Sequence, residues 1–551
     1  MRLKSLFMSM AAGLALVGCS SEDDMLNGGT DPATGETGYI AVNIVQPKTV
    51  GSRAQTGDYE NGTADENLAR EGLFYIFNSD GQVQTINNQT SQRVTLSGDG
   101  MKDDPAIERI YNAVLLINGI KDDPTENAKQ IVCILNAPAG FENFTINTLS
   151  DLQAKVDDYC TDKTEAGKFV MSNSVYNDAD GNLIIGTPVT ADKVKTSASE
   201  ALNDPVDIYV ERVVAQVRAH EKDGGMTNEG VTIPVDGKDT KFNIVIDAMA
   251  LTNLSDKANM IKSIDGYTAS WNWNSPENFR SFWEIMPAKI GDTEQVTIQK
   301  YSWNQMAGNA NGYYQAGNSP CFKQYILPNT FTAAKGEIIN TAIVVAAHLT
   351  DENGNNADLV WIRGGYTTDE SAKNVIATAV FNQFRYYKKT DDNKYMSLEP
   401  NDFEWTNEAS DKGYLCYAKL KETFGTDNKV YTLAGNTATE VTDGVENVNS
   451  YLDTKSNNLY ARKYTDGKCY YFVEIEHVAA LNDNAAIKGI VRNHIYDLTL
   501  NSIEGPGIPV FDPDDQVIPE NPDEDEKLYY LGAQVNVLDW RIVTQGINFG
   551  K

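Results

Sequence analysis

The sequence predicts a mostly β protein built from sandwiches of packed sheets. Short apolar stretches recur along the chain, and Asn, Gly, Asp or Pro follow most of them closely, as expected for strands that end in turns. Helical periodicity is scarce and is clearest in two short segments, residues 146–157 and 191–203. The chain has 551 residues, of which 41% are hydrophobic, so it is long enough for several domains and too apolar for a disordered protein.

The first segment is expected to direct export. Arg2 and Lys4 precede an apolar run over residues 6–17, which is too short to span a bilayer. The run ends in Leu16-Val17-Gly18-Cys19, which is similar to the lipobox of bacterial lipoproteins. Residues 1–18 are therefore predicted to be a signal peptide, and Cys19 the lipidated first residue of the exported chain. The alternative is an ordinary signal peptide with an incidental cysteine.

The first strand of the fold is predicted at residues 39–45. Ile40, Val42 and Ile44 alternate with other residues, so their side chains share one face. If this strand fills a groove in the domain, its removal would leave a hydrophobic slot and an unpaired sheet edge.

The loop that follows this strand is a candidate for proteolysis. Residues 51–58 are small and polar and contain one basic residue, Arg53, and protease cleavage concentrates at exposed loops of this kind. A cut between Arg53 and Ala54 would detach the first strand. The alternative is that this is an ordinary surface loop that is never cut. Arg70 is a second possible cut site, but the strand character of residues 74–77 begins close behind it.

Further strands are expected in both halves of the chain, and a polar, glycine-containing stretch at residues 221–241 is the predicted boundary between them. This boundary gives an amino-terminal sandwich domain over residues 54–225 and a second over residues 226–503. The expected strands are at residues 73–77, 113–117, 131–135, 208–217, 242–246, 342–347, 470–475 and 495–500.

The last part of the chain, residues 504–551, is predicted to be an acidic linker followed by a strand. Residues 504–526 contain nine acids and five prolines and no Lys or Arg, so this stretch cannot bury enough apolar surface to fold alone. Strand character returns near Val535, Val537 and Trp540. Two arrangements remain open: the last strand folds back into its own sheet, or the linker holds it away from the body for a neighbour.

Motifs of catalysis and of metal or cofactor binding are missing from the sequence. It contains no GxSxG, P-loop or GxGxxG pattern, and its four histidines have no metal-ligand spacing. The acidic run at residues 351–358 lacks the Glu that a calcium loop needs at its twelfth position, which favours a hairpin turn. We therefore predict no enzyme and no cofactor. The cysteines after Cys19 show no CxxC spacing and are expected in the core: Cys133, Cys160, Cys321, Cys416 and Cys469.

Two compositional features bear on ligands. The formal net charge of −31 opposes nucleic-acid binding, which needs a basic surface. An aromatic cluster could stack on sugars, which would make the chain a surface glycan-binding lipoprotein, although core packing is the more common role of such clusters. Its members are Trp271, Trp273, Phe279, Phe282 and Trp283.

The chain resembles the fimbrillins of the Bacteroidales, specifically the Mfa-type major subunit of the short fimbriae. The resemblance is spread over most of the chain, and the order and spacing of its parts make it specific. These parts are the lipobox at Cys19, Gly51-Ser52-Arg53-Ala54, Ile131-Val132-Cys133-Ile134-Leu135-Asn136, Val210-Glu211-Arg212-Val213-Val214-Ala215, Ile326-Leu327-Pro328-Asn329-Thr330, Asn340-Thr341-Ala342-Ile343-Val344-Val345-Ala346, Val491-Arg492-Asn493-His494-Ile495-Tyr496 and Val537-Leu538-Asp539-Trp540.

The resemblance implies two transthyretin-like β-sandwich domains and a C-terminal donor-strand arm. It implies export as a lipoprotein to the outer membrane, removal of the propeptide at residues 19–53 by an Arg-specific protease, and polymerisation by strand exchange. The residues that it assigns are Arg53 and Ala54 at the cut, Ile40, Val42 and Ile44 in the displaced strand, and Val535, Val537 and Trp540 in the donor strand.

The function that the resemblance implies is that of a stalk subunit of a cell-surface fimbria, which supports adhesion and biofilm formation. Its expected partners are copies of itself, accessory anchor and tip fimbrillins, the protease, and a host or bacterial surface ligand. An anchor or a tip fimbrillin is the alternative. A cleavable loop together with a C-terminal arm favours a stalk subunit, because an anchor needs no cut and a tip needs no donor strand.

Overall fold

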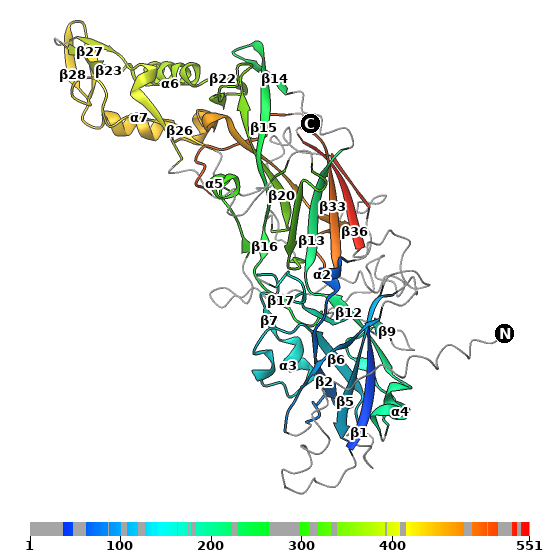
Figure 1. Ribbon diagram of the computed structural model, residues 1–551. Coiled ribbons are helices and arrows are strands. Elements are labelled where there is room, and N and C mark those ends of the chain that lie inside the picture. Colours follow the sequence, from blue (N-terminus) through cyan, green and yellow to red (C-terminus); the bar gives the residue numbers. More distant parts are fainter. Residues whose placement is uncertain are drawn as a thin grey trace.

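The structure of the protein is a computed structural model, shown as a ribbon in Figure 1. It contains two β units and a mixed lobe: the first unit is residues 37–213, the second is 214–368 with 461–549, and the lobe is 369–460. The residues described are 37–47, 62–85, 88–100, 107–118, 127–161, 163–174, 176–177, 183–195, 197–222, 230–263, 298–308, 314–315, 318–331, 339–391, 394–407, 415–478, 487–503, 505–515, 532–536 and 541–549.

The first unit is a nine-stranded sheet that folds into two layers around one core, in the order β3-β2-β6-β8-β12-β1-β5-β4 with β11 beside β6. The two layers meet at β12, because Val206–Tyr209 pairs with β1 and Val210–Arg212 pairs with β8. The strands are β1 (Thr37–Pro47), β2 (Glu71–Phe77), β3 (Gln92–Thr95), β4 (Ser97–Gly100), β5 (Ile107–Asn118), β6 (Gln130–Leu135), β8 (Met171–Asn173), β11 (Thr187–Pro188) and β12 (Val206–Arg212).

Three short helices lie at the margins of the first unit: α2 (Ala64–Asn67), α3 (Leu149–Gln153) and α4 (Ala198–Leu202). Each begins after a hydroxyl residue whose side chain accepts a hydrogen bond from a backbone N–H in the first turn, as helix N-caps do. The helices α3 and α4 fall within the two segments where the sequence predicts helical structure.

The second unit packs two sheets face to face. One has the order β29-β21-β22-β14-β15-β20-β30-β34 and the other β19-β13-β33-β36-β35. The strands are β13 (Ala215–Glu221), β14 (Val231–Val235), β15 (Lys238–Thr252), β19 (Phe322–Ile326), β20 (Ala342–Thr350), β21 (Leu359–Ile362), β22 (Gly365–Thr368), β29 (Ala461–Tyr464), β30 (Lys468–Glu474), β33 (His494–Ile503), β34 (Ile508–Pro509), β35 (Gly532–Asn536) and β36 (Arg541–Phe549).

The long strand β15 shows how burial follows the sequence. Near its start, Phe242 and Ile244 are buried and alternate with exposed Val245, because one face of the strand is open to solvent. Near its end, residues 248–252 are all buried, because helix α5 (Trp303–Ala307) covers the second face with a small core of its own.

The chain crosses from the first unit to the second between β12 and β13. The sequence shows one strand-rich stretch at residues 208–217, and the structure divides it into two strands in different sheets. The polar stretch at residues 221–241, which is the predicted boundary, contains β14 and the start of β15. Strand β13 lies before residue 225 but pairs with strands of the second unit.

The lobe projects from the second unit and has its own hydrophobic core (Figure 1). The scarcity of helix expected from the sequence is wrong here, because the lobe contains the 16-residue helix α6. Its buried residues have helical spacing, but three of the five are alanines, so the apolar stripe is faint: they are Ala372, Ile376, Ala377, Ala379 and Val380. The lobe elements are α6 (Asp369–Phe384), β23 (Tyr387–Lys389), β24 (Tyr395–Ser397), β25 (Phe403–Thr406), β26 (Tyr417–Leu420), β27 (Val430–Ala434), β28 (Thr437–Glu440) and α7 (Gly444–Leu452).

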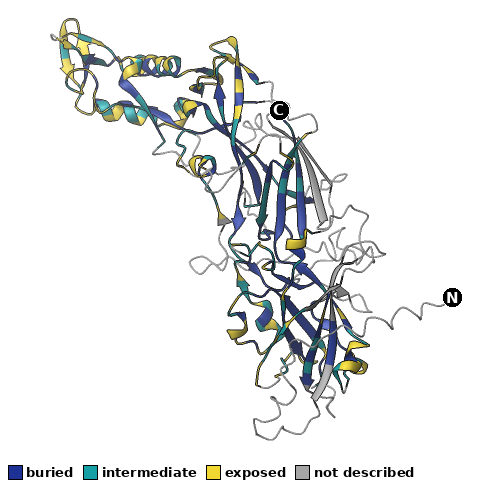
Figure 2. Cartoon of the chain, viewed as in Figure 1, coloured by how far each residue is buried: buried dark blue, intermediate teal, exposed yellow. Residues whose placement is uncertain are grey.

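Short strand pairs complete the described fold, and one of them joins the two units, because β17 pairs with β7. Figure 2 shows that burial follows the central strands of both units, whereas many exposed residues lie on the lobe. The prediction of a mostly β fold with sandwich-like sheets is confirmed. The remaining short strands are β7 (Val156–Asp157), β9 (Tyr176–Asn177), β10 (Leu183–Ile184), β16 (Leu254–Ser255), β17 (Ala258–Asn259), β18 (Ile298–Gln299), β31 (Glu476–Val478) and β32 (Ile487–Lys488).

Candidate functional site

The first strand of the described chain, β1, lies inside a sheet between β5 and β12 (Figure 1). It pairs antiparallel with β5 along its whole length, from Thr37 opposite Asn118 to Pro47 opposite Ile107. On its other side it pairs parallel with β12, but only from Val42 to Val45. The strand predicted to fill a groove therefore occupies one, and β5 and β12 form its two edges.

The side chains of β1 belong to the core of the first unit. Ile40 and Val42 are both 0% exposed and pack in the same cluster as Phe74 and Leu115. The backbone of Ile44 pairs with Tyr111 on one side and with Ile208 on the other. Ile44 is two residues beyond Val42, so it has the same strand parity as Ile40 and Val42. If β1 were absent, the edges of β5 and β12 and the sites of Ile40 and Val42 would be uncovered.

The chain after β1 leads to the predicted cut. Arg53 and Ala54 lie outside the described residues, as does Cys19. At the start of helix α2, Thr63 and Glu66 cap each other. Thr63 N–H donates to Glu66 Oε2 at 2.6 Å, and Glu66 N–H donates to Thr63 Oγ1 at 3.3 Å.

The second possible cut site, Arg70, is placed in folded structure. Its N–H donates to Asn136 Oδ1 at 3.1 Å, and its carbonyl accepts from Leu96 N–H at 3.0 Å. Strand β2 begins at the next residue. A protease needs an extended, accessible backbone, so a backbone bonded on both sides is a poor substrate even though the Arg70 side chain is exposed.

The C-terminal strand folds back onto its own subunit. Strand β36 pairs parallel with β33, from Arg541 opposite His494 to Phe549 opposite Ile503, and β35 pairs antiparallel with β36 as an outer hairpin strand. Of the two arrangements left open by the sequence, the structure contains the folded-back one. Val535 lies in β35, whereas Val537 and Trp540 lie outside the described residues, as do residues 516–531. The first part of the predicted linker, residues 505–515, is described, and β34 within it pairs with β30.

The two units meet at a buried polar junction centred on Glu66 and Arg212. Arg212 Nε donates to the Glu66 carbonyl at 3.1 Å, and Arg212 Nη1 donates to Asn493 Oδ1 at 3.1 Å. Gln216 Nε2 donates to Glu66 Oε1 at 3.0 Å, and Tyr325 O–H donates to the same oxygen. Burial alone would raise the pKa of Glu66, but the hydrogen bonds from Tyr325 and Thr63 and the charges of Arg212 and Lys323 lower it below its ordinary value.

Several motifs of the resemblance converge near this junction. The side chain of Arg492 is fully buried and donates to the carbonyls of Asn259 at 2.7 Å and Met260 at 3.2 Å. Asn493 has a left-handed backbone with φ of 57°, which Asn tolerates better than most residues, and its N–H donates to the Val214 carbonyl at 2.8 Å. The motifs at residues 210–215 and 491–496 are therefore neighbours in space, a contact between the units that sequence spacing alone could not indicate.

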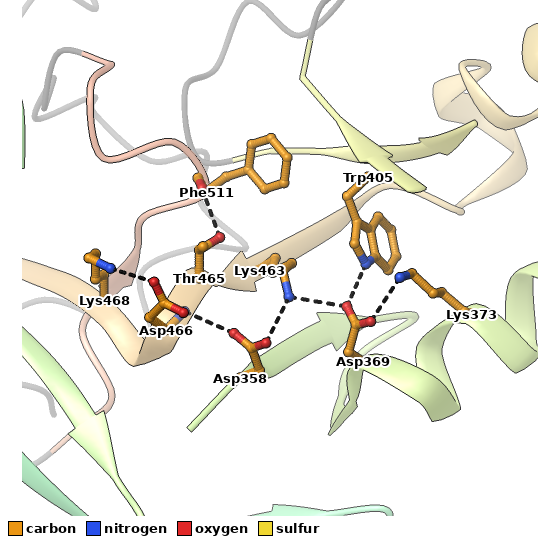
Figure 3. A network of polar contacts seen from close by, with 9 residues as sticks. All are labelled: Asp358, Asp369, Lys373, Trp405, Lys463, Thr465, Asp466, Lys468 and Phe511. Atoms are coloured by element: carbon orange, nitrogen blue, oxygen red, sulfur yellow. Dashed lines mark hydrogen bonds and ion pairs between the residues drawn. The ribbon is translucent and has the colours of Figure 1, made fainter. Parts of the chain in front are cut away.

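A polar network fixes the lobe to the second unit (Figure 3). Asp369, in the first turn of α6, accepts from Trp405 Nε1 at 2.7 Å and pairs with Lys373 at 2.9 Å and with Lys463 at 3.1 Å. Lys463 also pairs with Asp358 at 3.5 Å. Burial alone would raise the pKa of Asp369, but Lys373, Lys463 and Trp405 lower it below its ordinary value.

The network continues toward the start of the C-terminal arm. Asp466 N–H donates to Asp358 Oδ1 at 2.8 Å, and Thr465 Oγ1 donates to the Phe511 carbonyl at 2.7 Å (Figure 3). Phe511, in the first part of the predicted acidic linker, is therefore bonded to the turn that directly follows β29.

The described histidines have structural partners. His220 lies between Ser319 Oγ at 2.8 Å and Asp497 at 3.0 Å, and Arg218 binds the same carboxylate at 2.6 Å, so the group ties β13, β33 and the turn before β19 together. Further histidine pairs are His348 with Asp247 and His477 with Tyr496. His494 Nδ1 lies 2.6 Å from the Arg492 carbonyl.

The other chemical features of the sequence add no site. Asp351 accepts hydrogen bonds from Asn353 and Asn355, which confirms a turn there. Within the described ranges, no group of three or more His, Cys, Asp or Glu side chains could hold a metal ion. No helix in the described part of the chain is long and apolar enough to cross a membrane. The aromatic cluster at residues 271–283 lies outside the described residues.

The cysteines after Cys19 are free in the structure. Cys133, Cys321, Cys416 and Cys469 are buried, and Cys160 is half-buried. Burial raises the pKa of the Cys416 thiol to about 12, so this side chain stays protonated at neutral pH. The expectation of core positions is confirmed for the four buried residues.

Comparison with known families gives a match to one segment of this chain. Residues 462–546 match the family profile described as "Major fimbrial subunit protein type IV, Fimbrillin, C-terminal". The matched segment runs from β29 into β36, so it includes the junction residues Arg492 and Asn493 and the C-terminal hairpin. The fimbrillin resemblance predicted from the sequence is confirmed over this segment.

Solved structures of fimbrial proteins are similar to this chain at low identity. A fimbrilin (FimA) from Porphyromonas gingivalis W83 has 12% identity and a TM-score of 0.35, with 93% of this chain and 97% of that chain covered. The C-terminally truncated tip fimbrial protein Mfa3 from Porphyromonas gingivalis has 11% identity and a TM-score of 0.27, with coverages of 58% and 79%. A fimbrial assembly protein from Parabacteroides distasonis ATCC 8503 has 10% identity and a TM-score of 0.26, with coverages of 57% and 82%. At these TM-scores the likenesses carry no further argument. The comparison with curated proteins found no match.

Proposed function

We propose that this chain is a structural stalk subunit of a cell-surface fimbria, related to the Mfa-type major subunit. The carrying observation is the position of β1, because an N-terminal strand that lies between β5 and β12 can be exchanged for another strand. The polymer forms when β1 leaves and the C-terminal strand of another copy takes its place. The match of residues 462–546 to a fimbrillin family supports the same assignment.

Processing starts with export. The signal peptide is removed, Cys19 is lipidated, and the precursor is anchored to the outer membrane with β1 in its groove. An Arg-specific protease then cuts between Arg53 and Ala54, which separates β1 from α2. The bonds that Gln216 and Tyr325 of the second unit make with Glu66 of α2 support this step, because they hold the chain after the cut while β1 is freed.

Exchange gives the polymer its stability. A strand in the groove completes the hydrogen-bond ladders of β5 and β12 and buries apolar side chains in the sites of Ile40 and Val42. At about 25 cal/mol per Å2 of apolar surface, a long apolar strand contributes many kcal/mol. Val535, Val537 and Trp540 are the proposed donor residues, and accessory anchor and tip fimbrillins end the filament.

A cleavage experiment tests the proposal. Purified precursor is treated with an Arg-specific protease and examined for ladders that resist SDS. The wild-type chain and an Arg70→Ala variant are expected to polymerise, whereas Arg53→Ala is expected to stay monomeric. Deletion of residues 528–551 is expected to leave a folded monomer that is cut but forms no ladder. A ladder from Arg53→Ala equal to that of the wild type would contradict the mechanism.

A further inference from the structure

The two sides of β1 are held unequally. Among the residues that the structure describes, Thr37 to Ala41 have a ladder partner only on the β5 side, whereas Val42 to Val45 are paired on both sides. At the other end, only Gln46 and Pro47 are paired on one side, and the register shifts between them. Opening Thr37–Ala41 therefore breaks one ladder, while opening Val42–Val45 breaks two at once.

The β5 segment opposite Thr37–Ala41 has the backbone groups and side chains that an incoming strand needs. It runs from Val114 to Asn118, and Leu115 and Ile117 within it point into the core with 0% and 1% exposure. If Thr37–Ala41 separates, this segment presents unpaired backbone groups and two apolar side chains together. That combination suits an extended apolar strand, because backbone bonds supply affinity and alternate side chains fill pockets.

Helix α4 covers this end of the groove. It directly precedes β12, which starts opposite Val42, and it lies against β1 and the end of β5 (Figure 1). Ala201 is fully buried, whereas Leu202 is exposed. A helix of five residues is not stable alone, and α4 depends on its cap, in which Ser197 Oγ accepts from Glu200 N–H at 3.3 Å.

We propose that the β5 segment Val114–Asn118 is the first docking edge for a strand of a second copy, and that α4 guards it. The incoming strand pairs there as Thr37–Ala41 separates, and then replaces β1 toward Pro47. This order rests on the proposed strand exchange and adds its direction and the surface where it begins. A start at the Pro47 end gains at most two singly paired residues before it meets the doubly paired segment.

Hydrogen exchange followed by mass spectrometry tests the order of opening in the uncut precursor. Amides of residues 37–41 that are bonded to β5 are expected to exchange first, and the β5-bonded amides of residues 42–45 at least tenfold more slowly. Faster exchange at residues 42–45 would overturn the proposal. This readout does not need polymerisation, so it keeps its meaning even if the precursor never forms filaments.

Polymerisation rates of the protease-cut chain test whether α4 protects the β5 segment Val114–Asn118. Ser197→Ala removes the cap of α4 and is expected to speed polymer formation about fivefold, whereas Ser197→Asp keeps a capping oxygen and is expected to stay within twofold of wild type. Leu202→Ser, at an exposed position, is the surface control. Equal rates for Ser197→Ala and wild type would overturn the proposal, whereas a wild-type chain that forms no polymer would count against the proposed function instead.

Discussion

Glu66 illustrates how single residues hold this molecule together. Its carboxylate is buried between the two units, where it accepts from Gln216, Tyr325 and the Thr63 N–H. In the sequence it stands in an ordinary polar stretch, and its partners lie up to 259 residues away. The sequence pattern indicates the strands around Glu66 but not its hydrogen bonds to distant residues, because no local periodicity encodes contacts at such separations.

Replacing Glu66 by Gln is expected to lower the free energy of unfolding by about 2 kcal/mol at pH 7, because a buried charged acceptor is lost. The folded-state pKa of Glu66 is lowered from 4.5, so its contribution is present above pH 4.5 and is lost as the pH falls through the folded-state value. The gap between wild type and variant should therefore shrink in acid. Urea unfolding at pH 7 and near pH 4 measures it.

The control for this prediction is Asp65→Asn, in the same helix and exposed to solvent. It should change stability by less than about 0.5 kcal/mol at either pH. A gap between wild type and Glu66→Gln that stays constant with pH would show that Glu66 does not contribute through its charge.

At the scale of elements, strand prediction succeeded where hydrophobic runs are strong and failed where packing decides. The runs at residues 73–77 and 131–135 became β2 and β6, whose burial is nearly continuous. The stretch at residues 208–217 looked like one strand, but its middle residues form the crossing between the units. Helix α6 was missed because alanines form much of its buried face, although Thr368 with Asp369 and Glu370 gives a capping signal in the sequence.

Asp369→Asn tests what fixes α6 in place. The change removes the charge that binds Lys373 and Lys463 and weakens the bond from Trp405, so the stability of the lobe is expected to fall by about 2 kcal/mol at pH 7. Limited proteolysis of the lobe should become faster. The matched control is Asp466→Asn, an exposed residue that pairs with Lys468, and its effect should be within about 1 kcal/mol. Equal effects of the two changes would contradict a special role for Asp369.

At the scale of the whole molecule, the candidate site was only partly predictable. The sequence placed the first strand correctly, because Ile40 and Val42 alternate, and the structure puts both in the core. It left the C-terminal strand open between two arrangements, because composition describes the stiffness of the linker and not the edge where the strand pairs. The lobe was not foreseen, because it interrupts the second unit between β22 and β29 without a linker-like composition.

The lobe is expected to be separable from the two β units. Its core draws on the second unit mainly through Val360, Ile362 and Ala461. In the test, a short Gly-Ser linker replaces residues 370–460, and Val360→Thr and Ile362→Thr make the newly exposed surface more polar. This variant should keep a cooperative thermal transition and a β-type circular dichroism spectrum. Loss of both would show that the second unit needs the lobe to fold.

The position of strand β12 has a mechanical consequence. One part of it borders β1, and its last residue, Arg212, bonds the second unit through Asn493. In a filament of exchanged strands, tension between copies would enter along the groove and pass lengthwise through β12 into the next unit. Ladders pulled lengthwise resist in shear, with many bonds loaded at once, whereas ladders peeled from one end fail bond by bond. In such a filament, the groove would be aligned to bear load.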